Sequence, residues 1–393
     1  MMIAPATNAA PVARLRSAHV ATGFVFAVHG AANGTFATRI PWIRDRLGLS
    51  AAALGLALLM PALGALLAMP ITGVLVHRFD GRTVTRVLVG AFCVTLAAPP
   101  LAPSLPLLCL ALVVFGAAAG MADIAMNTQG SLIEESSGRP VMSGLHGMWS
   151  VGGIAGSVGG VLAAHAGLDA RIHLGAMAVI LLVVSQVAGR RLLRAAPAAA
   201  DADHPAPALA WPTRPVLLIG LVGFCAVFAE GATGDWCAVY LRDVVGASPA
   251  TAAAAYTGFA CAMAAGRLTG DRIVGRFGPV GTVRVGGATA TAGALLVVVS
   301  RTPLLAIPGF ALIGLGIAVV VPLAFAAGGR AVPHAGQGIA AVATIAYGAG
   351  LAAPGAVGAI AQASSLPAAF VVVAMLSTLF ALGAGALRPP RPG

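Results

Sequence analysis

The sequence predicts an all-α membrane protein, and three observations support this fold class. The chain of 393 residues is 59% hydrophobic and only 9% charged, and its mean hydropathy is +0.95. A soluble globular protein usually carries about 25% charged residues. Apolar segments of about 20 residues, long enough to cross a bilayer as helices, recur from one end of the chain to the other. We therefore expect the bilayer, and not a soluble core, to set the architecture.

Twelve apolar segments fit the length of a transmembrane helix, and an even number of spans leaves both ends of the chain on one side of the membrane. We expect these spans at residues 17–38, 51–76, 84–103, 105–133, 141–164, 171–189, 215–241, 249–268, 281–300, 303–327, 336–361 and 366–387.

The longest polar stretch, residues 190–214, is rich in alanine and proline and is typical of a linker. We expect a six-helix bundle over 1–189, a cytoplasmic linker over 190–214 and a second six-helix bundle over 215–393. The segment HRFDGRTVTRV at 77–87 resembles GRFGPVGTVRV at 275–285, and each copy follows the second span of its half. The bundles are therefore predicted to be pseudo-repeats, an architecture typical of transporters with a substrate site near the bilayer midplane.

The basic residues indicate the orientation. All 23 are arginines, they give a net charge of +11, and they lie in short loops between apolar segments, so we do not expect nucleic-acid binding. With the amino terminus in the cytoplasm, 17 arginines, Arg267 among them, fall in cytoplasmic segments and 6 fall in outer loops. This distribution follows the positive-inside rule and predicts that both termini are cytoplasmic. No arginine is expected in the middle of a span, which disfavours an acidic substrate.

Several functional classes lack their sequence signatures. The five cysteines form no CxxC pair, so we expect neither a disulfide framework nor a metal site. The sequence has no Walker loop, HExxH motif or nucleophile elbow, which disfavours ATP-driven transport and membrane enzymes. We therefore expect no cofactor and no catalytic residue.

Two loops carry a resemblance to a known family. GVLVHRFDGRTVTR at 73–86 resembles the loop motif of the major facilitator superfamily, although His77 stands where the family usually has aspartate. GRLTGDRIVGRFG at 266–278 keeps the acidic and basic residues of the motif. The resemblance implies a charge latch on the cytoplasmic side that helps to set the inward and outward states, whereas a positive-inside anchor without a gating role is the alternative. The gating residues that it implies are Arg78, Arg82, Asp271, Arg272 and Arg276.

The resemblance extends to a bacterial branch of the superfamily near the fucose permeases. It rests on the stretches at 122–153 and 230–243 and on the second loop. In sugar permeases of this group, carboxylates in the first and fourth spans serve substrate binding and proton coupling. Asp123 resembles the carboxylate of the fourth span, but the first span offers His29 and Asn33 instead.

Asp123 is also singled out by its position. A charge at the centre of a bilayer costs about 2.5–3.5 kcal/mol on insertion scales, and such residues usually face a water-filled path. Asn127 follows one helical turn later, on the same face of the helix. We expect Asp123 and Asn127 to face a central cavity, with Asp123 as the first candidate for a proton site; a static hydrogen bond between helices is the alternative.

Other polar residues inside the spans are weaker candidates. His146 and Trp149 share a face of the fifth span, and His146 beside Asp123 would complete a proton relay. Trp149 could stack on a sugar or an aromatic ring. The alternatives are a histidine fixed by a neighbour and a tryptophan packed between helices. The remaining candidates for a substrate or proton site are Glu230 and Asp235 of the seventh span and Tyr347 of the eleventh.

Taken together, these features predict a secondary active transporter in the cytoplasmic (inner) membrane that works by alternating access. We expect it to couple to protons, to carry a small polar metabolite such as a sugar, and to act as a monomer in the lipid bilayer. An exporter of drugs or amphipathic metabolites is the alternative within transport. A receptor that uses a transporter scaffold without moving a substrate is the alternative from another class.

Overall fold

The computed structural model describes residues 12–49, 51–194, 213–247 and 249–389, and every regular element within them is helical. The first elements are α1 (Val12–Ala37), α2 (Ile40–Leu47), α3 (Ala51–Arg78), α4 (Gly81–Thr95), η1 (Pro99–Leu101), α5 (Leu105–Ser137), α6 (Met142–His165) and α7 (Ala170–Gly189). The later elements are α8 (Arg214–Asp243), α9 (Pro249–Val299), α10 (Pro303–Ile317), α11 (Val320–Arg330), α12 (Ala335–Ala363), α13 (Leu366–Gly383) and η2 (Ala384–Leu387).

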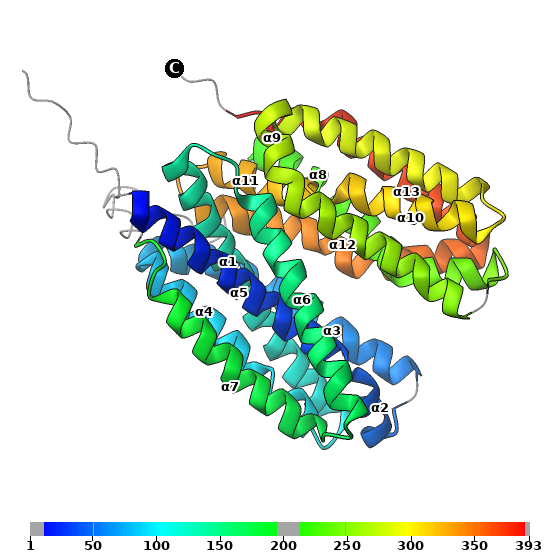
Figure 1. Ribbon diagram of the computed structural model, residues 1–393, viewed down its shortest axis with the longest axis horizontal. Helices are drawn as coiled ribbons and strands as arrows, with labels where there is room; N and C mark the ends of the chain where they lie inside the picture. Colours follow the sequence, from blue (N-terminus) through cyan, green and yellow to red (C-terminus); the bar gives the residue numbers. More distant parts are fainter. Residues whose placement is uncertain (1–11, 50, 195–212, 248, 390–393) are drawn as a thin grey trace, which may run out of the picture.

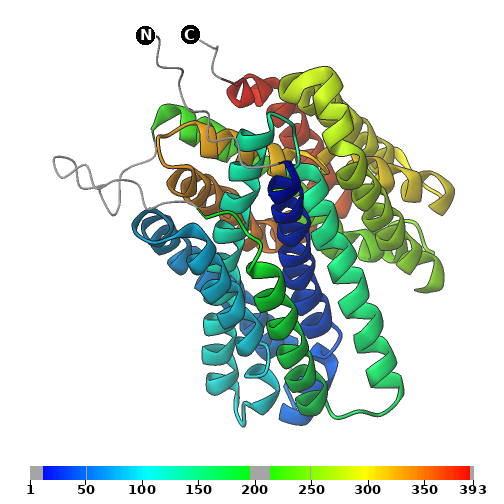
Figure 2. The same ribbon diagram turned by 60° about the vertical axis from the view of Figure 1, so that its left-hand side comes forward.

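The helices lie in two groups. Figure 1 shows α1–α7 side by side in one group and α8–α13 in the other. The groups come close at the end where α1 begins, and they diverge toward the end that carries α2 (Figures 1 and 2). The main contacts between the groups run from α3 to α12 and from α6 to α9. Below, the end where α1 begins is called the closed end and the end that carries α2 is called the open end.

Nine helical segments within the described residues are long and apolar enough to cross a membrane. One of them, Ala255–Val299, covers most of the two predicted spans at 249–268 and 281–300. The helix α9 that contains it is interrupted at Gly278, where φ is 72°, and Pro279 follows directly. Glycine tolerates this left-handed conformation and proline lacks a backbone donor, so the sequence places a break between the two parts of α9.

The short helix α2 was not predicted, because eight residues are far too few to cross a bilayer. It ends at Gly48, whose φ of 59° suits the end of a helix. Of the predicted linker, residues 195–212 lie outside the described residues. The segment just before them is held to α5 by Gln129, which exchanges two hydrogen bonds of 3.1 Å with the backbone of Leu193.

Glycines let α1 and α6 approach closely. A side chain at Gly30 would collide with the backbone oxygen of Trp149, and one at Gly152 would collide with the backbone of Ala27. Small residues at such an interface bring two helix backbones together in a membrane. This contact brings His29, the neighbour of Gly30, beside Trp149.

Large apolar side chains cover much of the outer surface. Leu304, Leu382 and Val285 are 81%, 76% and 70% exposed, and similar side chains occur along most of the helices. A surface of this kind suits contact with lipid chains. The polar residues discussed below lie instead between the two groups of helices or at the two ends.

Candidate functional site

A cavity of about 380 Å³ lies between the two groups of helices. The first group contributes small and apolar residues of α3 and α5 together with polar side chains of α1, α5 and α6. The second group contributes side chains of α8, α9, α11 and α12. The polar side chains that line the cavity are His29, Asn33, Asp123, His146, Trp149, Glu230, Arg267 and Tyr347.

Asp123 lines this cavity and is the centre of a chain of hydrogen bonds, whereas Asn127, which was expected to face the cavity, is fully buried and does not line it. The side-chain amide of Asn127 donates to the backbone oxygen of Asp123 at 2.9 Å and to Oδ1 at 3.2 Å. Because the amide nitrogen points at Asp123, Oδ1 of Asn127 is left to accept a hydrogen bond, and it lies 3.1 Å from Nε2 of His146. His146 therefore carries its proton on Nε2, and its ring lies between Phe26 and Phe325. The structure thus brings together three of the predicted residues.

Tyr347 extends this chain into the second group of helices. Its hydroxyl donates to Oδ2 of Asp123 at 3.1 Å, and its ring packs edge-on against Phe325. The bond links α12 to α5, so it joins the two groups directly at the cavity.

His29 is held by two partners whose roles are fixed. Its Nε2 lies 3.1 Å from the backbone oxygen of Ala119, which can only accept, and its Nδ1 lies 2.9 Å from the indole nitrogen of Trp149, which can only donate. His29 is therefore neutral and carries its proton on Nε2. Asn33 donates to the backbone oxygen of His29 at 2.9 Å. In this state His29 positions Trp149 and has no free site for a second proton.

Arg267 corrects the sequence-based expectation. The sequence placed Arg267 among the cytoplasmic arginines, but Arg267 is only 6% exposed and its side chain lines the cavity. Its Nη2 lies 3.1 and 3.2 Å from the two carboxylate oxygens of Glu230, and its Nη1 lies 3.2 Å from the hydroxyl of Ser150. The guanidinium carbon is 5.9 Å from the centre of the Trp149 ring. Arg267 therefore joins α9 to α6 beside the cavity.

A signal for Arg267 was present in the sequence. In the repeat of 77–87 and 275–285, Arg276 corresponds to Arg78, so Arg267 corresponds to Met69 of the first half. Met69 lies within the apolar part of α3, is buried and lines the cavity. The repeat thus indicates a position inside the membrane, whereas counting by charge assigned Arg267 to a loop. In the predicted orientation, 16 arginines then remain in cytoplasmic segments against 6 in outer loops.

Asp235 lies apart from the other candidates. It is exposed and does not line the cavity, although it follows Glu230 on the same helix. Five residues along an α-helix turn the side chain to a different face. The structure therefore brings Glu230, but not Asp235, to the residues around Asp123.

At the closed end, two carboxylates cap the first turn of α6. Oε1 of Glu134 accepts from the backbone nitrogens of Val141 and Met142 at 2.8 and 3.2 Å. The carboxylate of Asp271 accepts from the backbone nitrogens of Ser143 and Gly144 at 2.9 and 2.7 Å. These four groups have no partner within the helix, and negative charge is favourable at a helix N-terminus.

This double cap crosses between the two groups of helices. Asp271 belongs to α9 and Glu134 to α5, while Arg330 of α11 lies 3.7 Å from Oε2 of Glu134. The first turn of α6 is therefore held from both groups, and separation of the closed end requires that Asp271 leave it.

The other predicted gating residues have different surroundings. Arg82 donates from Nε to the backbone oxygen of Leu192 at 2.8 Å, which ties α4 to the segment after α7. Arg276 lies 5.5 Å from the ring centre of its neighbour Phe277. Arg78 and Arg272 are exposed. Of the five residues, Asp271 is the one seen to contact the opposite group in the part of the chain that the structure describes.

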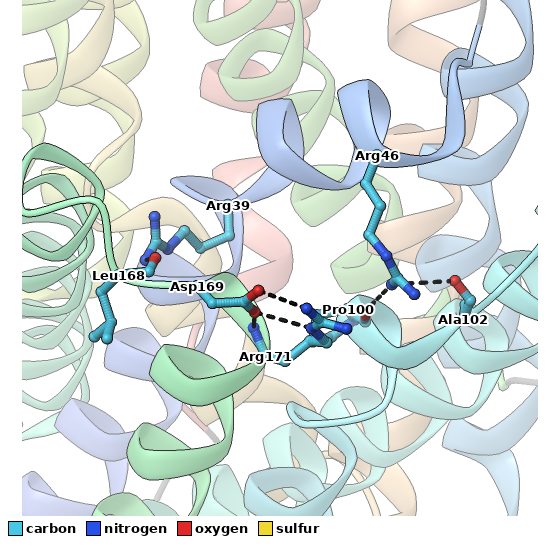
Figure 3. A network of polar contacts seen from close by, with 7 residues as sticks. All are labelled: Arg39, Arg46, Pro100, Ala102, Leu168, Asp169 and Arg171. Carbon is cyan, nitrogen blue, oxygen red and sulfur yellow. Dashed lines mark hydrogen bonds and ion pairs between the residues drawn. The ribbon is translucent and has the colours of Figure 1, made fainter.

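Arginines brace the open end of the first group (Figure 3). The buried Arg39 donates to the backbone oxygen of Leu168 at 2.7 Å and to Nδ1 of His173 at 3.1 Å. Arg46 of α2 donates to the backbone oxygens of Pro100 and Ala102, which precede α5. These bonds join α1 and α2 to the loops before α5 and α7.

Asp169 and Arg171 form an ion pair of 2.7 Å in the loop before α7 (Figure 3). Hydrogen bonds from the side chain and backbone of Arg171 lower the pKa of Asp169 to about 2. The pair is exposed to solvent, where such interactions contribute little to stability. It therefore serves local structure at the start of α7.

The described residues contain no group of three or more side chains suited to hold a metal ion. Cys93, Cys225 and Cys237 are buried, and Cys261 is exposed.

Comparisons with known proteins agree with this architecture. A family model described as Major Facilitator Superfamily matches residues 22–354. An uncharacterized MFS-type transporter of Yersinia pestis is 38% identical over 373 residues, which is 94% of this chain and 96% of the relative. The chain therefore shares both its family and nearly its whole length with a bacterial relative.

Solved structures show the same fold. The transporter FucP in its outward conformation has a TM-score of 0.79 at 16% identity, covering 95% of this chain and 99% of FucP. A second structure, described as the Escherichia coli fucose:proton symporter FucP, has a TM-score of 0.76 at 15% identity, covering 95% and 98%. At such identities the likeness concerns the fold alone. Because the family model matches most of the sequence, the chain belongs to the Major Facilitator Superfamily and is a multi-pass transmembrane transporter, not an enzyme.

Proposed function

We propose that this transporter is driven by protons, that it moves a small polar metabolite such as a sugar, and that Asp123 is its proton site. The observation that carries the proposal is the hydrogen bond from Tyr347 to Asp123, which joins the two groups of helices at the cavity. A proton that binds to Asp123 changes this bond. Proton binding is thereby coupled to the relative position of the two groups.

The charges of the cavity support a coupled proton. Asp123 and Glu230 each contribute a negative charge and Arg267 a positive one, while His29 is neutral. His146 donates through Nε2, and its Nδ1 has no hydrogen-bond partner among the described residues, so we take it as neutral. The formal charge is then −1. A buried charge without a partner is costly in a membrane, and one proton on Asp123 removes it when a neutral substrate is bound.

The proton also changes which hydrogen bonds are available. With Asp123 ionised, the Tyr347 hydroxyl donates to a charged acceptor, which is a strong interaction. With Asp123 protonated, the carboxyl group is itself a donor and the Tyr347 hydroxyl is released to bind a substrate hydroxyl. Asp123 thereby links the proton to a polar substrate without direct contact between the two.

For the membrane arrangement we propose the twelve spans and two six-helix bundles expected from the sequence, over residues 1–189 and 215–393 with a linker at 190–214. The proposed location is the inner membrane, with both termini in the cytoplasm and the protein acting as a monomer. The excess of arginine at the closed end supports this orientation. The described state is then open to the outside, and Asp271 with Glu134 forms the inner gate together with basic residues of the two loops.

The decisive experiment uses proteoliposomes that contain the purified protein and a pH-sensitive dye inside. Sugars, polyols, amino acids and nucleosides are added one at a time to the outside. A transported neutral substrate is expected to acidify the interior in wild-type protein and in the Glu135→Gln control, whose carboxylate is exposed and outside the cavity. Asp123→Asn is expected to abolish the signal. Proton-driven uptake that is undiminished in Asp123→Asn would reject Asp123 as the proton site.

Export of amphipathic compounds is the second candidate. It is favoured by the apolar part of the cavity wall, which includes Ala62, Ala65, Met69, Val227 and Val321. In this case, a proton gradient across the proteoliposome membrane would drive amphipathic compounds from the side that corresponds to the cytoplasm to the opposite side. The sugars and polyols would give no signal.

A further inference from the structure

In the cavity, three polar side chains already donate their hydrogen bonds to acceptors within the protein, whereas several acceptors can take further hydrogen bonds. The indole of Trp149 donates to His29, His29 donates to Ala119, and the hydroxyl of Tyr347 donates to Asp123. The polar hydrogens of these side chains therefore already have acceptors within the protein. A substrate finds few unused donors on this part of the wall.

Acceptors remain available on the same wall. The side chain of Glu230 is 34% exposed, and its two carboxylate oxygens are hydrogen-bonded only to Arg267 among the described residues. The Nδ1 atom of His146 is unpaired within the described part of the chain. Each carboxylate oxygen of Asp123 accepts one side-chain hydrogen bond and has a further lone pair. The wall is therefore rich in acceptors and carries a surplus negative charge.

Arg267 does not alter this balance. Its Nη2 faces both oxygens of Glu230, its Nη1 faces Ser150, and its Nε lies 3.4 Å from the backbone oxygen of Ala318. An anion that bound Arg267 would have to displace Glu230 and leave that carboxylate without a partner in the cavity that Asp123 also lines. An acidic substrate is thus disfavoured for a different reason from the one the sequence suggested.

We propose that the cavity also binds small amines, with the ammonium group in place of the proton at Asp123. The inference rests on the proposed function, because it takes Asp123 as the site where the surplus charge is neutralised. An ammonium group supplies both the positive charge and the hydrogen-bond donors that the wall lacks. One ammonium enters as one proton leaves, so the exchange is electroneutral, and amines are exchanged for protons whereas neutral substrates travel with them.

Among the described residues, five other titratable or charged groups line the cavity with Asp123. They are His29 of α1, His146 of α6, Glu230 of α8, Arg267 of α9 and Tyr347 of α12. The wall contributed by α3 and α11 consists of Ala62, Ala65, Met69 and Val321. We therefore expect an amine and a proton to compete for the carboxylate of Asp123. Glu230 is the second carboxylate that lines the cavity.

Binding is tested first, with compounds that share a scaffold and differ in charge. The three sets are glucose, glucosamine and glucuronate; sorbitol, glucamine and gluconate; and phenethyl alcohol, phenethylamine and phenylacetate. The purified full-length protein is titrated with each compound, and the melting temperature is recorded, since a ligand that binds the folded state raises it. On at least one scaffold the amine is expected to bind at least about tenfold more tightly than its neutral partner, as expected for a charge-assisted hydrogen bond.

Two variants separate the effect of the Asp123 charge on amine binding from a general loss of the fold. Asp123→Asn is expected to bring the ratio of amine to neutral binding close to one, while Glu135→Gln keeps it. If Asp123→Asn unfolds, Glu230→Gln serves as the second variant and is expected to reduce the ratio. No amine binding on any scaffold, or neutral and acidic members that bind as tightly as the amines, would overturn the proposal.

Proton movement is measured next with glucosamine, which crosses protein-free vesicles slowly because it is highly polar. Added outside, it is expected to make the interior more alkaline in wild-type proteoliposomes but not in Asp123→Asn or in empty vesicles. If neutral compounds acidify the interior while amines neither bind nor move protons, the proposed function stands and the amine proposal fails. If amines bind but no compound moves protons, the binding proposal stands and proton coupling fails.

Discussion

The closed end and the open end of this transporter are held in different ways. At the closed end, Asp271 of the second group caps α6 of the first group, and Arg330 approaches Glu134. At the open end, the hydrogen bonds described for Arg39 and Arg46 all stay within the first group. The closed end is thus fastened by a few charged contacts between two bodies, whereas the open end is braced inside one body.

This difference indicates that the two groups of helices separate more readily at the closed end than the first group comes apart at the open end. The contacts of Asp271 are charge-assisted hydrogen bonds to a helix N-terminus that water can replace when the end opens. The arginine contacts at the open end join loops of one group, so they survive if that group moves as a unit. Between the two ends, hydrogen bonds from Tyr347 to Asp123 and from Arg267 to Ser150 join the groups at the cavity.

The largest expected effect on stability concerns the ion pair of Glu230 and Arg267, which lies between the two ends. Glu230→Ala leaves Arg267 buried without its carboxylate, which is expected to cost roughly 3 kcal/mol of stability, less than a fully buried pair because Glu230 is partly exposed. The melting temperature of the purified protein measures this loss. The double variant Glu230→Ala with Arg267→Met is expected to be more stable than the single variant. If the double variant is as unstable as the two single losses combined, the pair is not coupled.

The next largest effect concerns the closed end. Asp271→Asn keeps the shape of the side chain but removes its charge, and it is expected to weaken the cap of Ser143 and Gly144 by about 1.5 kcal/mol. Hydrogen exchange of the first turn of α6 is then expected to become about tenfold faster. Glu135→Gln is the control, because it also removes one carboxylate charge near the start of α6, and this exposed side chain does not contribute to the described cap. Equal exchange rates in the two variants would contradict a specific role for Asp271.

A smaller effect is expected at the link across the cavity. Tyr347→Phe removes the hydroxyl that reaches Asp123 but keeps the ring against Phe325, so it is expected to cost about 1 kcal/mol. Tyr256→Phe is the matched control, since Tyr256 is 53% exposed. Thermal unfolding at a pH near neutral measures both variants. The same loss in both would mean that the link across the cavity carries no stability of its own.

The smallest effect is expected at the open end. Asp169→Asn removes an exposed ion pair, so transport and melting temperature near neutral pH are expected to remain as in the wild type. The pKa of Asp169 is depressed to about 2, so its contribution is present above the ordinary pKa of an aspartate and is lost only as the pH falls toward 2. A clear loss of transport in Asp169→Asn at neutral pH would show that the open end does more than brace one group.

The sequence indicated the helices and part of the site well, for local reasons. Apolar length predicts helices in a bilayer, and the spacing of Asp123 and Asn127 predicts a shared face, which the hydrogen bonds between them confirm. The pairing of Arg267 with Glu230 and of Asp271 with α6 depends on residues far apart in the chain, which no local pattern encodes. Glu230 was expected to be the better buried of the two carboxylates in α8, and helix rotation is the reason that Asp235 does not meet the cavity.

Spin-label distances test the difference between the two ends most directly. In protein with Cys261 replaced by Ser, one pair of labels at Arg139 and Gly275 reports the closed end, and a second pair at Arg44 and Arg301 reports the open end; all four positions are exposed. Asp271→Asn is expected to add longer distances to the first pair and shorter distances to the second, because opening one end closes the other. Distance distributions identical to those of the wild type at both ends would contradict the assignment of Asp271 as the contact that holds the closed end together.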